Sequence, residues 1–270
     1  MAYELIVLDL DGTLTNSKKE ITPATRQALI EIQKAGKKVV LASGRPEKGV
    51  IKVAKELEMD KYGSYILSFN GARIRQTHNH EIVYSHLVPR EYWRDVYEMV
   101  LEAPGVDIIA YDDNNSYSGI VVNEYTILAD KINDVPIIEV ENFPEAIDFP
   151  VNCFHVAGDP ELLAPLTDRM SEAFEGKLSC FRSDPFYQNI MPLGIDKATS
   201  LLALLDHLGL TRENMICCGD GYNDISMIEV AGLGVAMENA MDVVKEAADY
   251  ITLSNDEEGV LHVINKFMRD

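Results

Sequence analysis

Residues 5–13 read Leu-Ile-Val-Leu-Asp-Leu-Asp-Gly-Thr, and this stretch decides the fold. Its leading apolar residues predict a buried strand that delivers two carboxylates, Asp9 and Asp11, at its carboxyl end. Side chains alternate between faces along a strand, so positions two apart begin on the same side. Two acids held together repel each other unless a cation or a shared proton compensates. Gly12 permits a tight turn and Thr13 adds a hydroxyl. A solvated acidic turn is the simpler alternative, but it does not explain the apolar run before it.

The composition is that of an ordinary globular protein with a strong acidic excess. The chain has 270 residues, enough for one large domain or two modest ones. Its 24 Lys and Arg against 44 Asp and Glu give a net charge of −20, which argues against a nucleic-acid-binding surface. No apolar run approaches the length of about 18 residues that a membrane span needs, and the amino terminus lacks a secretory pattern. We therefore expect a cytoplasmic protein with no nucleic-acid or membrane partner, either a monomer or a small homo-oligomer.

The first 70 residues alternate strand and helix. Thr22 and Pro23 open the first predicted helix as N-cap and first helical residue. The βαβαβ rhythm implies a parallel sheet with right-handed crossovers, and ligands of such sheets bind beyond the carboxyl ends of the strands. Asp9, Ser43 and Asn70 all fall at that edge. The predicted strands of this segment are 5–8, 38–42 and 65–68.

The rhythm changes at about residue 72 and returns after Pro192. Between these points the texture is α+β, which indicates an inserted domain. We predict an α/β fold in which residues 1–84 and 190–270 form one parallel-sheet core and residues 85–189 form an inserted α+β domain. Within the insert we expect helices at 92–101 and 161–174, and strands at 107–111, 119–122, 137–140, 151–156 and 178–181.

Polar residues gather at the predicted strand ends of the core. Carboxylates such as Asp9, Asp11 and Asp220 are the hard oxygen ligands that Mg²⁺ selects. A hydroxyl at Ser43 and an ammonium at Lys197 suit the peripheral oxygens of a phosphoryl group. Neither Gly-x-Gly-x-x-Gly after a strand nor Gly-x-x-x-x-Gly-Lys-Ser/Thr occurs, so nucleotide-binding folds lack support. The set favours phosphate transfer over carbonyl or hydride chemistry.

Four signatures occur in order at 9–13, 43–46, Lys197 and 219–224. With them the chain resembles the haloacid dehalogenase (HAD) superfamily, in its Cof-like group of sugar-phosphate phosphatases. The resemblance covers the whole chain and implies a Rossmann-like parallel-sheet core. It also implies an α+β cap that sets substrate specificity, inserted after the second signature, where the spacing to Lys197 leaves room for one.

The resemblance also implies a role for each matched residue. Asp9 would be the nucleophile, forming an aspartyl-phosphate, and Asp11 the acid and base. Mg²⁺ would be held by Asp9, the Asp11 backbone carbonyl and Asp220. Asp224 would lie next to these ligands without binding the metal itself, and would orient a metal-bound water or Lys197. The residues expected to bind the substrate phosphoryl group are Leu10, through its N–H, Ser43, Gly44, Lys197 and Asn223.

Some positions depart from the pattern or invite other interpretations. Ser43 stands where the family more often has Thr, which keeps the hydroxyl. Asp196 stands where relatives carry Asn or Ser, and we expect it to pair with Lys197 or to bias substrate choice. The histidines at 78 and 80 fit a solvated turn better than a metal pair, and His155 fits a structural role.

These observations together predict a Mg²⁺-dependent phosphatase that acts on small phosphorylated metabolites, with sugar phosphates favoured. Two alternatives stay open from the sequence. One is a phosphomutase or phosphotransferase of the same fold. The other is a non-catalytic regulator that binds a phosphorylated metabolite.

Overall fold

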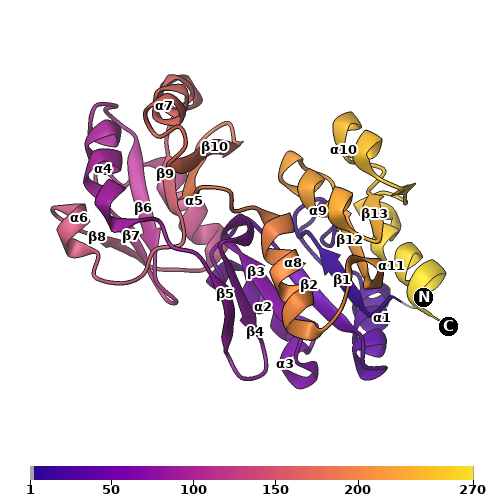
Figure 1. The fold of residues 1–270 in the computed structure, drawn as a ribbon. Helices are drawn as coiled ribbons and strands as arrows, with labels where there is room; N and C mark the ends of the chain where they lie inside the picture. Colours follow the sequence, from indigo (N-terminus) through magenta and orange to yellow (C-terminus); the bar gives the residue numbers. More distant parts are fainter. Residues whose placement is uncertain (1–2, 270) are drawn as a thin grey trace. The chain divides into compact units, whose positions relative to one another are not determined.

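The computed structural model describes residues 3–269, which fall into two compact units (Figure 1). The first unit comprises Met1–Ser43, Val50–Tyr84 and Asp196–Asp270, and the second comprises Gly44–Gly49 and Ser85–Ile195. Compared with the boundaries expected from the sequence, residues 44–49 and 190–195 group with the second unit. Among the described residues, no helix combines the length and apolar character of a membrane span.

The first unit is built on an eight-stranded sheet in the order β14-β13-β12-β1-β2-β3-β4-β5. Neighbours from β14 to β3 run parallel, and β4 runs antiparallel to β3. Strand β1 lies between β12 and β2, so Asp9 leaves the middle of the parallel part at its carboxyl edge. The strands are β1 Leu5–Leu8, β2 Lys38–Ala42, β3 Tyr65–Ser68, β4 Arg73–Gln76, β5 Ile82–Ser85, β12 Met215–Gly219, β13 Leu233–Ala236 and β14 Tyr250–Ile251.

Helices cover both faces of this sheet. Ile6 and Leu8 pack in a core with apolar side chains of α1 and α11, whereas Leu5 and Val7 pack on the other side with those of α8. Burial on both faces explains why the parallel strands read as continuous apolar runs. The helices of this unit are α1 Pro23–Lys34, α2 Lys48–Glu56, α3 Met59–Tyr62, α8 Lys197–Leu208, α9 Ile225–Val230, α10 Asp242–Ala247 and α11 Gly259–Val263.

The second unit contains a six-stranded sheet in the order β10-β11-β9-β6-β7-β8. Its neighbours are antiparallel except β7 and β8, which run parallel. The mixed sheet matches the α+β texture of the sequence. The elements are α4 Trp93–Leu101, β6 Asp107–Tyr111, β7 Ser116–Ser118, α5 Glu124–Asn133, β8 Ile137–Glu139, α6 Phe143–Ala146, β9 Phe154–Ala157, α7 Pro160–Ala173, β10 Leu178–Asp184 and β11 Tyr187–Pro192.

In the second unit one expected strand was misplaced, and α5 and β11 were not predicted. The strand expected at 119–122 lies earlier, at Ser116–Ser118. It is followed by helix α5, which the sequence pattern did not predict. Helix α5 cannot be recognised from hydrophobic periodicity, because it exposes Ile127, Leu128 and Ile132 and buries polar residues. This is the reverse of an ordinary amphipathic helix. Strand β11 was also missed, since polar Gln188 and Asn189 interrupt its apolar pattern.

Candidate active site

Strand β1 ends in a tight turn that holds Asp9 in place. The Asp9 N–H donates to Cys218 O of β12 at 3.1 Å, which extends the sheet pairing by one residue. Gly12 has a φ of +90°, and a Cβ atom there would lie 2.3 Å from Asp220 Oδ2. Only glycine therefore allows the turn to approach Asp220 so closely.

Lys197 lies at the centre of the hydrogen bonds of the site. It is the first residue of α8, and Lys197 as a whole is 1% exposed. Lys197 Nζ donates to Asp9 Oδ1 at 2.7 Å, Asp224 Oδ1 at 2.6 Å and Ala42 O at 3.0 Å. An ammonium has three protons, so all of its donors are engaged by the protein. Burial alone would lower the pKa of Lys197, but Asp224 and Asp9 outweigh it and raise that pKa.

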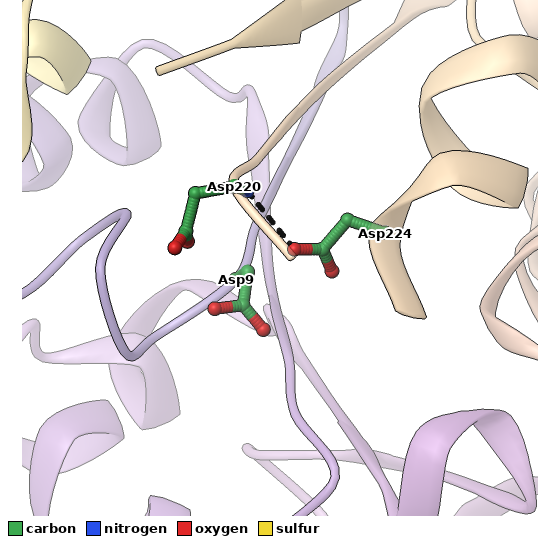
Figure 2. Close-up of side chains that lie close together, drawn as sticks. All are labelled: Asp9, Asp220 and Asp224. Atoms are coloured by element: carbon green, nitrogen blue, oxygen red, sulfur yellow. Dashed lines mark hydrogen bonds between the residues drawn. The ribbon is translucent and has the colours of Figure 1, made fainter. Parts of the chain in front are cut away.

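Asp224 stabilises the loop that follows β12. Its Oδ2 accepts hydrogen bonds from the N–H groups of Asp220 and Gly221, each at 3.0 Å, while Oδ1 accepts from Lys197. The dashed line in Figure 2 marks the bond to the Asp220 backbone. Asp224 is 1% exposed. With both oxygens engaged, its carboxylate fixes the position of Asp220 and Lys197.

Three carboxylates meet beside Lys197. Asp9, Asp220 and Asp224 each place an oxygen within 4.8 Å of the others (Figure 2). Burial, then Asp224, raises the pKa of Asp9 well above its usual range despite Lys197. Burial raises the pKa of Asp220 to about 6. Three carboxylates face one ammonium, so the site carries a surplus of negative charge when they are ionised, and the ligand atoms are all hard oxygens. This donor set fits a divalent cation.

Thr13 orients the Asp220 carboxylate. Its hydroxyl donates to Asp220 Oδ1 at 2.7 Å, and Thr13 itself is 1% exposed. The sequence indicates this hydroxyl but not its partner, because the partner lies 207 residues further along the chain. The hydrogen bond favours the ionised form of Asp220 and so opposes the effect of burial on its pKa.

Asp11 stands apart from the three carboxylates. Its side chain is 37% exposed, and its Oδ1 accepts a hydrogen bond from Lys19 Nζ at 2.7 Å. Lys19 adopts a positive φ of 61°, a backbone conformation uncommon outside glycine. The metal contact expected of Asp11 involves its backbone carbonyl, and that contact stays a prediction.

Ser43, Asn70 and Asn223 meet at the carboxyl edge of the sheet. The Ser43 backbone joins two segments, because its N–H donates to Leu67 O at 2.9 Å and its carbonyl accepts from Asn70 N at 3.0 Å. Asn223 Nδ2 donates to Asn70 Oδ1 at 3.0 Å. The first unit thus brings together two expected phosphate ligands, Ser43 and Asn223, and adds Asn70. Gly44 lies in the segment that groups with the second unit.

Of the two roles expected of Asp196, the pairing with Lys197 is not seen, and the bias in substrate choice stays a prediction. Asp196 is the N-cap of α8, and its Oδ1 accepts hydrogen bonds from Thr199 N and Thr199 Oγ1, both at 2.7 Å. A short side chain that accepts from the third residue of a helix is the usual capping arrangement. Asp196 therefore positions Lys197 through the helix start.

His155 lies inside the second unit. Burial lowers its pKa to about 4, and its ring meets Tyr111 at 5.2 Å between centroids. His78 lies beyond β4, where its Nδ1 lies 2.9 Å from Asp60 O. In the described part of the chain, the group of side chains that could hold a metal consists of Asp9, Asp220 and Asp224, and neither histidine is part of it.

Comparison with known proteins identifies the family. The family described as haloacid dehalogenase-like hydrolase matches residues 6–264. The chain belongs to this family. A haloacid dehalogenase-like hydrolase from Bacteroides thetaiotaomicron has a crystal structure that matches with a TM-score of 0.93 at 44% identity, covering 98% of this chain and 99% of that one.

Two further relatives of this HAD hydrolase match along their length. YxeH of Bacillus subtilis, provisionally named a phosphatase, is 33% identical over 269 residues, 98% of each chain. The subclass IIB sugar phosphatase BT4131 has a crystal structure with a TM-score of 0.79 at 25% identity, covering 98% of each chain. The resemblance to the Cof-like group, the α/β fold class and the identification as a HAD-type hydrolase are confirmed.

Proposed function

We propose that this HAD hydrolase is a cytoplasmic phosphatase that releases inorganic phosphate from small phosphorylated metabolites, with sugar phosphates favoured. The observation that carries the proposal is the pairing of Asp9 with Lys197 beside Asp220 at the carboxyl edge of the sheet. The sugar phosphatase BT4131, which matches over 98% of its length, supports the choice of substrate class.

Asp9 is the proposed nucleophile. Lys197 holds Asp9 Oδ1, and an Asp9 oxygen attacks phosphorus in line with the ester bond. A new P–O bond forms to Asp9 as the bond to the substrate oxygen breaks, which gives an aspartyl-phosphate. Asp11 gives its proton to the departing oxygen. Asp11 then takes a proton from water, the water oxygen bonds to phosphorus, and Asp9 is released with inorganic phosphate.

The residues that would hold a Mg²⁺ ion are Asp9, the backbone carbonyl of Asp11 and Asp220. When bound, the ion neutralises charge between the carboxylates and the phosphoryl group. Thr13 and Asp224 keep Asp220 aimed at this position through their hydrogen bonds.

The phosphoryl oxygens need donors around the nucleophile. The Ser43 hydroxyl, the Gly44 and Leu10 N–H groups, Lys197 and Asn223 are the proposed ones. Lys197 already uses its three protons on the protein. It therefore reaches the phosphoryl group only by exchanging one of these acceptors, and Asp9 is the acceptor whose charge falls when it bonds to phosphorus.

A panel of phosphate monoesters with Mg²⁺ tests the proposal. Release of inorganic phosphate from several sugar phosphates is the expected result. Formation of an isomeric sugar phosphate without free phosphate would instead indicate a phosphomutase. Ligand-dependent stabilisation with no turnover of any ester would indicate a binding protein.

A further inference from the structure

A short turn between β3 and β4 is anchored by its backbone at the carboxyl edge of the first unit's sheet. We call Phe69–Gly71 the 69–71 turn. The Asn70 N–H donates to Ser43 O at 3.0 Å, which joins the turn to the residue that follows β2. A Cβ atom at Gly71 would lie 2.2 Å from Asp196 O, so only glycine lets the turn pass this close to the start of α8. The turn therefore has a fixed place between β2 and α8.

Asn70 has a backbone conformation that few residues adopt. Its φ and ψ are 50° and 33°, and Phe69 before it has a φ of 53°. Asparagine enters this left-handed region more readily than most residues, but glycine does so without steric cost. The backbone alone would therefore be served as well by glycine at position 70. The presence of asparagine calls for an explanation from its side chain.

The Asn70 side chain makes one hydrogen bond in the described part of the chain, and its partner is Asn223. Asn70 Oδ1 accepts from Asn223 Nδ2 at 3.0 Å. Asn70 is 4% exposed, and its Nδ2 is buried without a hydrogen-bond partner among the described residues. Burying an amide donor without an acceptor lowers stability. Folding alone therefore does not account for this side chain, and the contact of its Oδ1 with Asn223 is what remains.

Asn223 lies in the loop after β12 and, unlike Asn70, is exposed. An exposed side chain samples several rotamers unless a contact selects one of them. The hydrogen bond to Asn70 uses one of the two protons on Asn223 Nδ2 and leaves the other for a ligand. A buried acceptor with a fixed backbone thus sets the direction of an exposed donor.

We propose that Asn70 is a positioning residue that holds the Asn223 amide, in a fixed place relative to Ser43, for the phosphoryl group of the substrate. The proposal rests on the proposed function, in which Ser43 and Asn223 bind that group. Asn70 is buried and acts through Asn223, not through a contact of its own with substrate. Donors held in place before the ligand arrives reduce the entropy lost on binding and in the reaction.

Asn70→Gly tests the proposal, because it suits the left-handed backbone and removes the acceptor. We expect kcat/KM to fall by at least about fivefold for a hexose phosphate and for phenyl phosphate alike, since these esters share the phosphoryl group. The affinity for inorganic phosphate in the presence of Mg²⁺ should fall by a similar factor, while the melting temperature stays within a few degrees of the parent. A loss confined to one ester, or a lower melting temperature with unchanged phosphate affinity, would overturn the proposal.

A double-mutant cycle shows whether Asn70 acts through Asn223. Asn223→Ala removes the donor, so adding Asn70→Gly to it should lower kcat/KM by no more than about twofold further. Effects that multiply in the double variant would show that Asn70 acts independently of Asn223, which would overturn the proposal.

Asn142→Gly is the matched control. Asn142 also has a left-handed backbone, with a φ of 53°, but it is exposed and its side chain makes no capping hydrogen bond. The same substitution there should leave kcat/KM and the affinity for phosphate unchanged. An equal loss in this variant would show that the flexibility of an added glycine is responsible, and the positioning role of Asn70 would fail.

Phosphate binding distinguishes failure of the positioning role from failure of the phosphatase assignment. If no ester is hydrolysed, but inorganic phosphate raises the melting temperature of the parent more than that of Asn70→Gly, the proposed function fails and the positioning role stands. If esters are hydrolysed and Asn70→Gly keeps the parent's kcat/KM and phosphate affinity, the positioning role fails and the phosphatase stands.

Discussion

Lys197 donates a hydrogen bond of 2.7 Å to Asp9, across 188 residues of sequence. The pair is almost fully buried, and Asp224 shares the same ammonium. A carboxylate fixed in this way cannot rotate freely, so under the proposed mechanism its oxygen is oriented before the substrate arrives. The lysine thus fixes the position of the proposed nucleophile and also balances its charge.

Asp9→Asn should abolish turnover while keeping the fold. The amide is a far poorer nucleophile than the carboxylate, so we expect phosphate release to fall by at least about 1,000-fold. Because the pKa of Asp9 is raised, an uncharged side chain is tolerated at this position, and the melting temperature should fall by a few degrees at most. Phosphate release and thermal unfolding together check this. Substantial residual turnover would refute the covalent mechanism.

Lys197→Met should destabilise the protein strongly. The change leaves Asp9 and Asp224 buried without their cation, and breaking such a buried pair typically costs about 3–5 kcal/mol of unfolding free energy. Urea unfolding of the parent and the variant measures the loss. Lys61→Met removes an exposed ion pair with Glu58 and serves as the control, for which no resolvable change is expected. Equal effects of the two substitutions would contradict the conclusion that Lys197 stabilises the buried Asp9 and Asp224.

Stability without divalent metal should fall as pH rises through about 6. The folded state holds the Asp220 proton more tightly than the unfolded chain, whose aspartates titrate at about 4. The stabilisation from this proton is therefore complete below about pH 4 and lost as pH rises through about 6. We expect Asp220→Asn to reduce the fall in melting temperature over this range by a few degrees. Thermal unfolding in EDTA across the range checks this, and identical pH profiles for parent and variant would speak against it.

Chelation by EDTA should stop phosphate release, and added Mg²⁺ should restore it. The site carries a surplus of negative charge that a divalent cation would neutralise. The ion should also stabilise the fold by about 2.7 kcal/mol at 100 times its dissociation constant. Activity and melting temperature measured over a Mg²⁺ titration check both effects. Hydrolysis that persists unchanged in EDTA would remove the metal from the mechanism.

Thr13→Val should weaken metal binding. The hydroxyl that orients Asp220 at 2.7 Å is lost while the shape of the side chain is kept. Groups that orient metal ligands typically affect affinity by about 10–100-fold, so we expect the Mg²⁺ concentration for half-maximal activity to rise by at least about tenfold. Thr13→Ser retains the hydroxyl and should keep the requirement near that of the parent. The same increase in both variants would show that the hydrogen bond is not responsible.

The sequence alone determined the parallel-sheet core and the family. Apolar runs that end in Asp9, Ser43 and Asp220 predict parallel strands whose carboxyl ends carry the chemistry, because both the strand pattern and the residue types are local. The same logic failed for α5. Its inward-facing Asp130 and outward-facing Ile127 contradict the periodicity from which helices are recognised.

Only the tertiary structure decided how the motif residues are paired. Lys197 uses its three protons on Asp9, Asp224 and Ala42, and Thr13 is aimed at Asp220, but these partners are separated by 27 to 207 residues. Nothing in a local pattern encodes such distances, since they depend on which strands become neighbours in the sheet. The opening stretch at residues 5–13 therefore contains the proposed nucleophile, while the fold supplies the lysine and the hydroxyl that arrange the site around it.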